Sequence, residues 1–193
     1  MLLKYIIGID EVGRGPLAGP VAVGAILATP DMLQAFTEIK ESKQLSEKKR
    51  ELWNDKILAA RGEGLRSVVC FVPAEEIDVI GIAPAIKKAL KEGLVQLAVD
   101  PTECRVLLDG GLYAPEEYIN QETIIGGDGK ETIIAMASVV AKVARDRLMV
   151  QLAESYPEYD FAKHKGYGTK AHMDAIRTHG LSKEHRRSFC KNI

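Results

Sequence analysis

The run IIGIDEVGRGPLAGP, residues 6–20, constrains this chain more than any other feature of its sequence. Residues 4–10 are mostly apolar, which is typical of a strand buried on both faces, and the strand ends in two adjacent carboxylates, Asp10 and Glu11. A Gly-Arg-Gly triplet follows at residues 13–15. Adjacent carboxylates repel each other unless a cation is present, and glycine lets a backbone approach a phosphate closely. The run therefore predicts metal-dependent chemistry on a phosphodiester.

Three properties of the composition narrow the class of protein. The 193 residues suffice for one domain, and 46% hydrophobic with 27% charged residues is typical of a globular protein in water. Apolar runs stay shorter than about 18 residues, and residues 1–5 lack a signal-peptide pattern, so we expect neither a membrane span nor export. Cys70, Cys104 and Cys190 lie far apart, which predicts a reducing cytoplasm rather than a disulfide framework.

The net charge of −1 hides an uneven distribution. Residues 163–193 carry eight Lys or Arg against two acids, a net of +6, whereas the rest carries 18 basic and 25 acidic residues, a net of −7. Such a basic segment is typical of a surface that binds a polyanion. A solvated helical surface would have the same composition, so charge alone leaves both readings open.

The order of predicted elements indicates an α/β fold. We expect strands over 4–10, 21–27, 67–72, 105–108 and 122–125. We expect helices over 46–60, from Pro84 onward and over 131–154, with short helical pieces over 170–178 and 182–189. Strands come first and then alternate with helices, and no linker interrupts them. This order predicts a mixed sheet with helices on its faces.

Four acids occupy predicted strand ends or turns: Asp10, Glu11, Asp109 and Asp128. Mg²⁺ prefers oxygen ligands and keeps several waters, so a few converging carboxylates suit it. Two such ions about 4 Å apart would activate a water and stabilise the leaving oxygen in phosphoryl transfer. Taken singly, Asp109 and Asp128 could instead form Asx turns or cap helices. The four histidines lack the spacing of a zinc site.

Further residues are candidates for contacts with a nucleic acid. Tyr167 stands between two glycines within basic residues and could stack on a base or sugar, or pack inside its loop. Lys43, Lys142 and Arg145 are candidate phosphate contacts, although a lysine chosen at random is usually only solvated.

Several blocks of the chain, in order, resemble the ribonuclease HII family of type 2 ribonucleases H. The blocks are GIDEVGRGPLAGP at 8–20, SKQLS at 42–46, LDG at 108–110, GD at 127–128, ASVVAKVARD at 137–146, KGYGT at 165–169 and HRRSF at 185–189. Residues 78–84 and 134–137 depart from the family pattern without touching a proposed metal ligand. The chain stops soon after Phe189, so we expect no appended clamp-binding peptide.

The resemblance implies an RNase H-like fold with a mixed five-stranded sheet flanked by helices. It implies a single domain over 1–193, with the core at about 1–155 and a basic helical part at about 156–193. It also implies a monomeric endonuclease, dependent on two Mg²⁺ or Mn²⁺ ions. Its substrates would be the RNA strand of RNA–DNA hybrids and single ribonucleotides in duplex DNA, cut to 5′-phosphate and 3′-hydroxyl ends, and no membrane would be involved.

The resemblance also implies roles for individual residues. The catalytic metal ligands would be Asp10, Glu11, Asp109 and Asp128. The reader of the ribonucleotide's 2′-hydroxyl would be Gly13, Arg14 and Gly15, and the reader of the following deoxyribose would be Tyr167. The phosphate contacts would be Lys43, Ser138 and Lys142.

Two other functions use the same features. A DNA junction resolvase could share the fold, but it has no need to read a ribose hydroxyl. A nucleic-acid-binding module without catalysis would not need all four acids. A duplex with one ribonucleotide, incubated with and without Mg²⁺, would distinguish the three functions.

Overall fold

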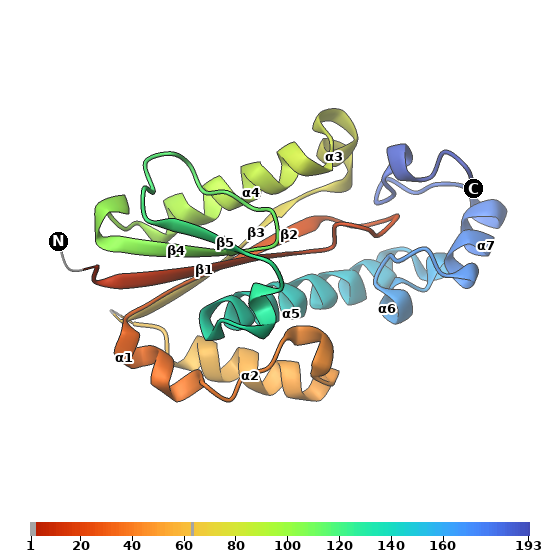
Figure 1. Cartoon of the computed structure of the whole chain (residues 1–193). Helices are drawn as coiled ribbons and strands as arrows, with labels where there is room; N and C mark the ends of the chain where they lie inside the picture. The colour runs from red at the N-terminus through yellow and green to blue at the C-terminus, as the bar shows by residue number, and fades with distance from the viewer. Residues whose placement is uncertain (1–2, 63) are drawn as a thin grey trace.

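A computed structural model describes residues 3–62 and 64–193 of the chain. Five strands form one sheet in the order β3-β2-β1-β4-β5 (Figure 1). The strands are β1 Tyr5–Val12, β2 Val21–Ala28, β3 Leu65–Val72, β4 Cys104–Asp109 and β5 Gln121–Ile124. Strand β2 is antiparallel to β1 and β3, whereas β4 is parallel to β1 and β5. A mixed five-stranded sheet with flanking helices confirms the expected fold class.

The helices account for most of the remaining chain. They are α1 Pro30–Leu33, α2 Glu47–Ala59, α3 Ala74–Ile80, α4 Ile82–Leu97, α5 Thr132–Ser155, α6 Phe161–His164 and α7 Lys170–His179. Short 3-10 turns are η1 Gln34–Phe36, η2 Ser42–Gln44, η3 Pro101–Glu103, η4 Gly127–Gly129, η5 Pro157–Tyr159 and η6 Arg187–Phe189. Helix α2 begins after its N-cap residue Ser46, whose Oγ accepts from the Lys49 N–H at 3.4 Å. Within the described residues, none of these helices is both long and apolar enough to span a bilayer.

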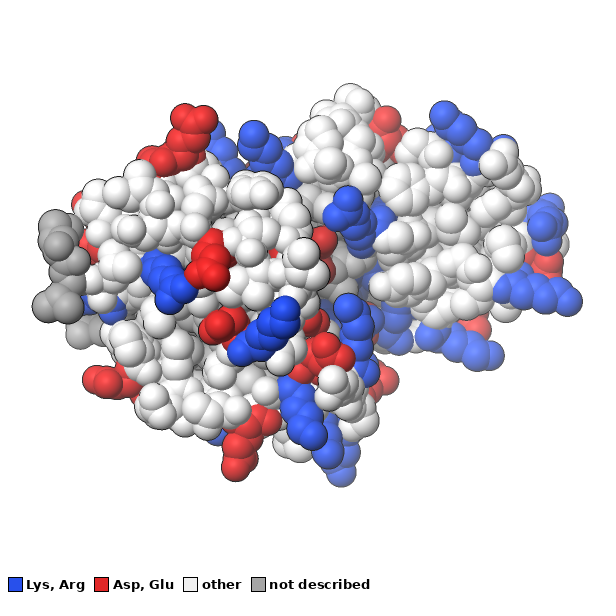
Figure 2. All heavy atoms as spheres, viewed as in Figure 1, with Lys and Arg blue, Asp and Glu red and all other residues white. Residues whose placement is uncertain are grey.

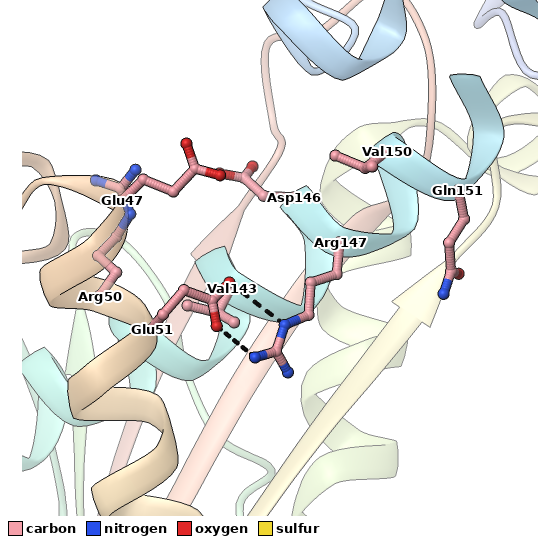
Figure 3. A pocket seen from close by; sticks show the side chains of 8 residues that line it. All are labelled: Glu47, Arg50, Glu51, Val143, Asp146, Arg147, Val150 and Gln151. Carbon is pink, nitrogen blue, oxygen red and sulfur yellow. Dashed lines mark hydrogen bonds and ion pairs between the residues drawn. The ribbon is translucent and has the colours of Figure 1, made fainter. Parts of the chain in front are cut away.

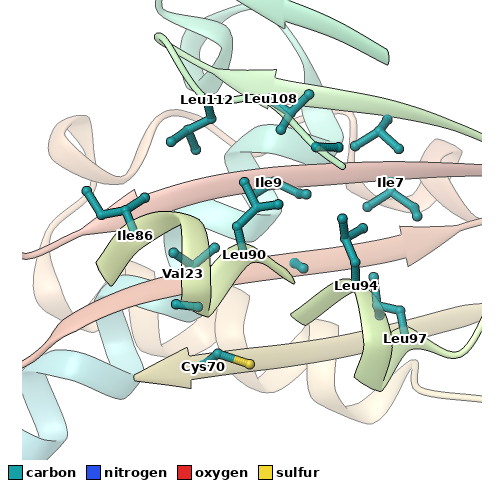
Figure 4. Packing of buried hydrophobic residues seen from close by; sticks show 14 of the residues in the cluster. Ile7, Ile9, Val23, Cys70, Ile86, Leu90, Leu94, Leu97, Leu108 and Leu112 are labelled. Atoms are coloured by element: carbon teal, nitrogen blue, oxygen red, sulfur yellow. The ribbon is translucent and has the colours of Figure 1, made fainter. Parts of the chain in front are cut away.

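The sheet separates two apolar layers. On one face, Ile7 and Ile9 of β1 pack against Leu90 and Leu94 of α4 (Figure 4). On the other face, the buried first half of α5 packs against the sheet together with α2. This burial explains why the first half of α5 is apolar on most sides.

A glycine in the middle of β1 lets α5 lie directly on the sheet. A Cβ atom at Gly8 would stand 2.4 Å from the Ile133 carbonyl oxygen, so only glycine fits there. The close approach fixes the position of α5 along the strand. Ser138 and Lys142, further along α5, consequently reach the end of β1 that carries the carboxylates.

The chain after α5 packs with the end of α5 in a smaller third cluster around Met149, Phe161 and Ile176. The short helix predicted over 182–189 is wrong, because only η6 is helical there. Instead, His185 forms an isolated antiparallel bridge with Ala18. Backbone groups that a helix would need are hydrogen-bonded in this bridge.

Other elements also differ from the sequence prediction. Strand β1 continues to Val12, so both of its carboxylates lie inside the strand rather than at its end. Helix α4 begins at Ile82, before Pro84. The sequence analysis did not predict α3, whose first turn carries two acids after Pro73.

Candidate active site

Parallel pairing of β1 with β4 brings the predicted acids together. Ile9 lies opposite Leu108, so the next residues along the two strands, Asp10 and Asp109, meet at the same edge of the sheet. A pocket of about 200 Å³ opens there. Its lining is Asp10, Glu11, Val12, Ser42, Lys43, Arg50, Asp109, Asp128, Ser138, Lys142 and Tyr167. One pocket therefore holds all the predicted acids together with residues separated by more than a hundred positions.

Asp128 reaches the pocket because a turn is tied to the end of β4. The Oδ1 atom of Asp109 accepts from the Gly127 N–H at 2.6 Å, which joins β4 to η4. The long helix α5 has Glu131 at its N-cap without a side-chain hydrogen bond, so Asp128 does not cap it. Asp109 thus bonds to a distant turn instead of forming a local Asx turn.

The clustered carboxylates make the pocket strongly unfavourable for negative charge. Burial is the main reason that the pKa of Asp10 is raised to about 7; a hydrogen bond with Ser138 opposes the rise, and the charges of Asp109, Glu11 and Asp128 add to it. The pKa of Glu11 and that of Asp128 are also raised, chiefly by burial. A cation in the pocket would oppose each of these shifts.

One oxygen in the pocket is available to such a cation. Glu11 Oε2 is buried and has no hydrogen-bond partner among the residues that the structure describes. An unpaired buried carboxylate oxygen is costly unless something else binds it. Across residues 3–62 and 64–193, however, no three His, Cys, Asp or Glu side chains form a group that could hold one ion. Hard divalent ions that retain several waters fit this donor set, because they need few protein ligands each.

Helix α5 and turn η2 line the opposite side of the pocket. Ser138 Oγ lies 2.9 Å from Ser42 Oγ, and Lys142 Nζ donates to Asp146 Oδ1 at 2.8 Å. Lys43 extends into the same pocket. The sequence analysis did not identify Arg50, which donates to the Ser42 carbonyl oxygen at 3.0 Å and so holds η2 in place.

The glycine–arginine loop lies beside the pocket rather than within its lining. Arg14 is 63% exposed and its Nη1 stands 3.5 Å from Glu11 Oε1. A side chain at Gly15 would meet no protein atom within 4 Å, so packing does not require glycine there. Gly13 adopts φ +84° and lies against Arg145, which only glycine can do without strain.

Two buried arginines hold this loop from behind. Arg145 donates to the carbonyl oxygens of Ala18, Pro20 and Lys165 at 2.8 to 3.2 Å, and it is fully buried. The interpretation of Arg145 as a phosphate contact is therefore wrong.

The second buried arginine, Arg186, was not identified from the sequence. It donates to the carbonyl oxygens of Gly13, Arg14 and Gly19 at 2.7 to 3.0 Å. One of the eight basic residues of the C-terminal segment therefore fixes the Gly-Arg-Gly loop instead of facing solvent.

Tyr167 reaches the pocket from the loop between α6 and α7. Its side chain is 43% exposed and lines the pocket that holds the carboxylates. The Arg145 guanidinium lies 6.0 Å from the ring centroid, on its face. The tyrosine is therefore anchored on one side and open on the other, unlike a packed loop tyrosine.

Acidic and basic side chains are both present on the surface around the carboxylate pocket. Figure 2 shows a hollow between the sheet and the C-terminal helices, with acidic side chains in it and lysine and arginine side chains around it. A neighbouring pocket between α2 and α5 has a larger volume, about 270 Å³. There Arg147 forms an ion pair with Glu51 (Figure 3). The carboxylate pocket is the stronger candidate, because four acids converge in it and the pKa of three of them is raised.

Comparison with known proteins gives a consistent result. The family model described as ribonuclease HII matches residues 7–192. A ribonuclease HII of Bacillus cereus (strain Q1) is 44% identical over 187 residues, which cover 97% of this chain and 69% of that protein. A ribonuclease HII of Endomicrobium trichonymphae is 44% identical over 184 residues, covering 95% and 84%.

Solved structures share the fold. The chain resembles the ribonuclease HII in the PCNA complex from Archaeoglobus fulgidus, with a TM-score of 0.75, 24% identity and coverage of 94% and 93%. It also resembles Bst-RNase HIII in complex with Mn²⁺, with a TM-score of 0.73, 17% identity and coverage of 98% and 69%.

Proposed function

The chain belongs to the ribonuclease HII family and is a ribonuclease H that acts on RNA in RNA–DNA hybrids, and from this premise we propose that it also cuts at single ribonucleotides in duplex DNA. The cut would leave 5′-phosphate and 3′-hydroxyl ends. One observation carries this proposal: the four acids and Tyr167 line the same pocket. Chemistry on the phosphodiester and reading of the adjacent sugar would then take place at one site.

We propose that Asp10, Glu11, Asp109 and Asp128 hold two divalent ions, Mg²⁺ or Mn²⁺. The unpaired buried oxygen of Glu11 and the raised pKa of Asp10 support a cation here. When bound, such ions lower the pKa of a water ligand and stabilise charge on the leaving oxygen. The carboxylates themselves fix where positive charge is placed, so the scissile phosphate is held in one orientation.

Residues on the wall of the pocket opposite the sheet would contact the neighbouring phosphates of the nucleic-acid backbone. Lys43 and Lys142 place ammonium groups in the pocket, and Ser138 offers a hydroxyl beside Asp10. Lys142 pairs with Asp146 in the free protein, so a phosphate would compete for its charge.

Two loops would recognise an RNA-to-DNA step. Gly13, Arg14 and Gly15 would bond the 2′-hydroxyl, since open space at Gly15 allows a sugar to approach the backbone. The Tyr167 ring would lie against the next sugar, where an added 2′-hydroxyl would crowd it. We further propose that the protein acts as a monomer. We also propose that it acts in the cytoplasm, where its three free cysteines would stay reduced.

Cleavage of matched duplexes tests these proposals. Four substrates of one sequence suffice: all DNA, all RNA, an RNA–DNA hybrid, and DNA with a single ribonucleotide, each with Mg²⁺ and with chelator. We expect Mg²⁺-dependent cleavage of the last two, with 3′ ends that a DNA polymerase extends. Cleavage of the hybrid alone would refute the single-ribonucleotide proposal, and ends that resist extension would refute the proposed end chemistry.

Tyr167→Ala tests the junction reading. Base or sugar stacking is worth roughly 1–3 kcal/mol, so we expect kcat on the single-ribonucleotide duplex to fall by about 10-fold or more while Kd changes little. Tyr167→Phe is the matched control, because it keeps the ring. Equal rates for Tyr167→Ala and the unaltered protein would make Tyr167 a packing residue.

A further inference from the structure

Three histidines are buried directly behind the Tyr167 loop, and the chemistry described so far does not use them. His164 is 9% exposed, His172 is fully buried and His185 is 2% exposed. They come from α6, α7 and the segment before η6. The rings of His164 and His172 are stacked with centroids 4.3 Å apart, and Phe161 packs against all three rings.

The hydrogen bonds of these rings have one consistent direction. The Ser182 N–H donates to His185 Nδ1 at 3.0 Å, so that nitrogen carries no proton and the neutral ring carries its proton on Nε2. His185 Nε2 lies 3.0 Å from His172 Nε2, which must therefore accept. The proton of His172 is then on Nδ1, which lies 2.9 Å from the carbonyl oxygen of Tyr167 and donates to it.

The backbone groups at the two ends of this chain of hydrogen bonds require the same direction of donation, from Ser182 toward Tyr167. A backbone N–H at Ser182 only donates, and a carbonyl oxygen at Tyr167 only accepts. The two imidazoles between them thus have a single neutral arrangement. His164 is fixed independently, because its Nδ1 accepts from the Gly166 N–H at 3.2 Å and its Nε2 lies 2.7 Å from the Tyr159 carbonyl oxygen.

The surroundings keep both rings of the pair neutral. Burial lowers the pKa of His185 to about 4, aided by His172, and burial likewise lowers the pKa of His172. The titratable groups that face the pair are His164 from α6 and Tyr159 from η5. Among the described residues, no carboxylate contributes to either shift. A proton added to His172 would place two N–H groups against each other, so the chain of bonds exists only in the neutral form.

We propose that His172 and His185 are positioning residues for recognition of the RNA–DNA junction, acting through the Tyr167 carbonyl. This inference rests on the proposed role of Tyr167. The chain of bonds ties the Tyr167 backbone to Ser182, and the same segment bridges Ala18 through His185. The imidazole pair thereby fixes Tyr167 relative to the loop that would read the ribose.

Three variants test the proposal on the single-ribonucleotide duplex. His172→Phe keeps the ring shape and the stacking on His164 but removes both hydrogen bonds, and we expect kcat to fall by about 10-fold with little change in Kd. His172→Asn should recover part of the rate, since its amide nitrogen takes the position of Nδ1 and can donate to Tyr167, whereas the bond to His185 stays lost. The double variant His172→Phe/Tyr167→Ala should be no slower than Tyr167→Ala alone, because the histidine acts only through that tyrosine.

Two further measurements decide the outcome. In ¹⁵N spectra of histidine-labelled protein, His172 should be protonated on Nδ1, and His164 and His185 on Nε2. Thermal unfolding shows whether His172→Phe folds, and if it does not, the His172→Asn rate and the spectra carry the test. Additive losses in the double variant, or protonation of His172 on Nε2, would overturn the proposal. If the unaltered protein leaves the single ribonucleotide uncut, the proposed function fails instead.

Discussion

The raised pKa of Asp10 predicts a trade between stability and activity that denaturation experiments can measure. The folded-state pKa is about 7, against 3.8 for the ordinary side chain, and Asp10 is 6% exposed. A proton therefore binds the folded protein more tightly than the unfolded chain. The resulting contribution to stability is complete below the unfolded pKa and is lost as the pH rises through about 7.

The magnitude follows from these two pKa values. Over the full range the contribution is about 4 kcal/mol, and between pH 5 and pH 8 it changes by about 2.5 kcal/mol. Asp10→Asn cannot ionise, so in chelator its free energy of unfolding should rise relative to that of the unaltered protein by this amount over the same interval. The comparison between two pH values cancels the intrinsic difference between Asn and a protonated Asp.

The assay is urea unfolding in chelator at pH 5 and pH 8, repeated with excess Mg²⁺. We expect Mg²⁺ to stabilise the unaltered protein more than Asp10→Asn, because a cation replaces the proton as partner of the carboxylate. The same substitution should abolish hybrid cleavage. Asp31→Asn, at an exposed acid on α1, is the control. Parallel stabilities of Asp10→Asn and the unaltered protein between pH 5 and pH 8 would refute the electrostatic reasoning.

Three other variants test separate parts of the molecule. Asp109→Asn keeps an acceptor for the turn it holds, so unfolding should be nearly unchanged while hybrid cleavage in excess Mg²⁺ is lost; near-normal turnover would remove Asp109 from the metal ligands. Lys170→Ala should flatten the slope of log affinity against log salt for duplex binding by about 0.9, whereas Lys91→Ala on α4 should leave it unchanged. Arg186→Met removes three hydrogen bonds to backbone carbonyl oxygens, two of them buried, and should cost about 3 kcal/mol in urea unfolding; a loss below about 1 kcal/mol would mean that the loop does not need them.

Sequence patterns were sufficient where the chemistry depends on strand ends. Asp10, Glu11 and Asp109 follow apolar runs, and parallel strands deliver such residues to one edge of a sheet. The position of Asp128 was harder to predict from the sequence. It depends on the hydrogen bond that the Gly127 N–H donates to Asp109 Oδ1, across 18 residues of sequence. Local spacing carries no signal of that distance.

The sequence analysis did not predict that two long, charged side chains are buried. Arg145 and Arg186 stand in basic, helix-like contexts, and charge is ordinarily a sign of exposure. Here both guanidiniums bind backbone carbonyl oxygens of the β1–β2 connection, which offers several unpaired acceptors at once. The sequence analysis likewise predicted a short helix over 182–189, but the bridge between His185 and Ala18 overrides a weak local preference.

The sheet and the C-terminal segment position different parts of the site. The acids come from the sheet edge and the adjacent turn η4, whereas the segment around His185 and Arg186 holds both loops that would read the sugars. Asp78 of α3 secures that segment by accepting from the Arg187 N–H at 2.7 Å and the Ser188 N–H at 2.9 Å. Loss of this attachment would leave the carboxylates in place on the sheet. Metal binding should therefore survive changes in the segment that abolish discrimination between ribose and deoxyribose, because different parts of the chain position the two functions.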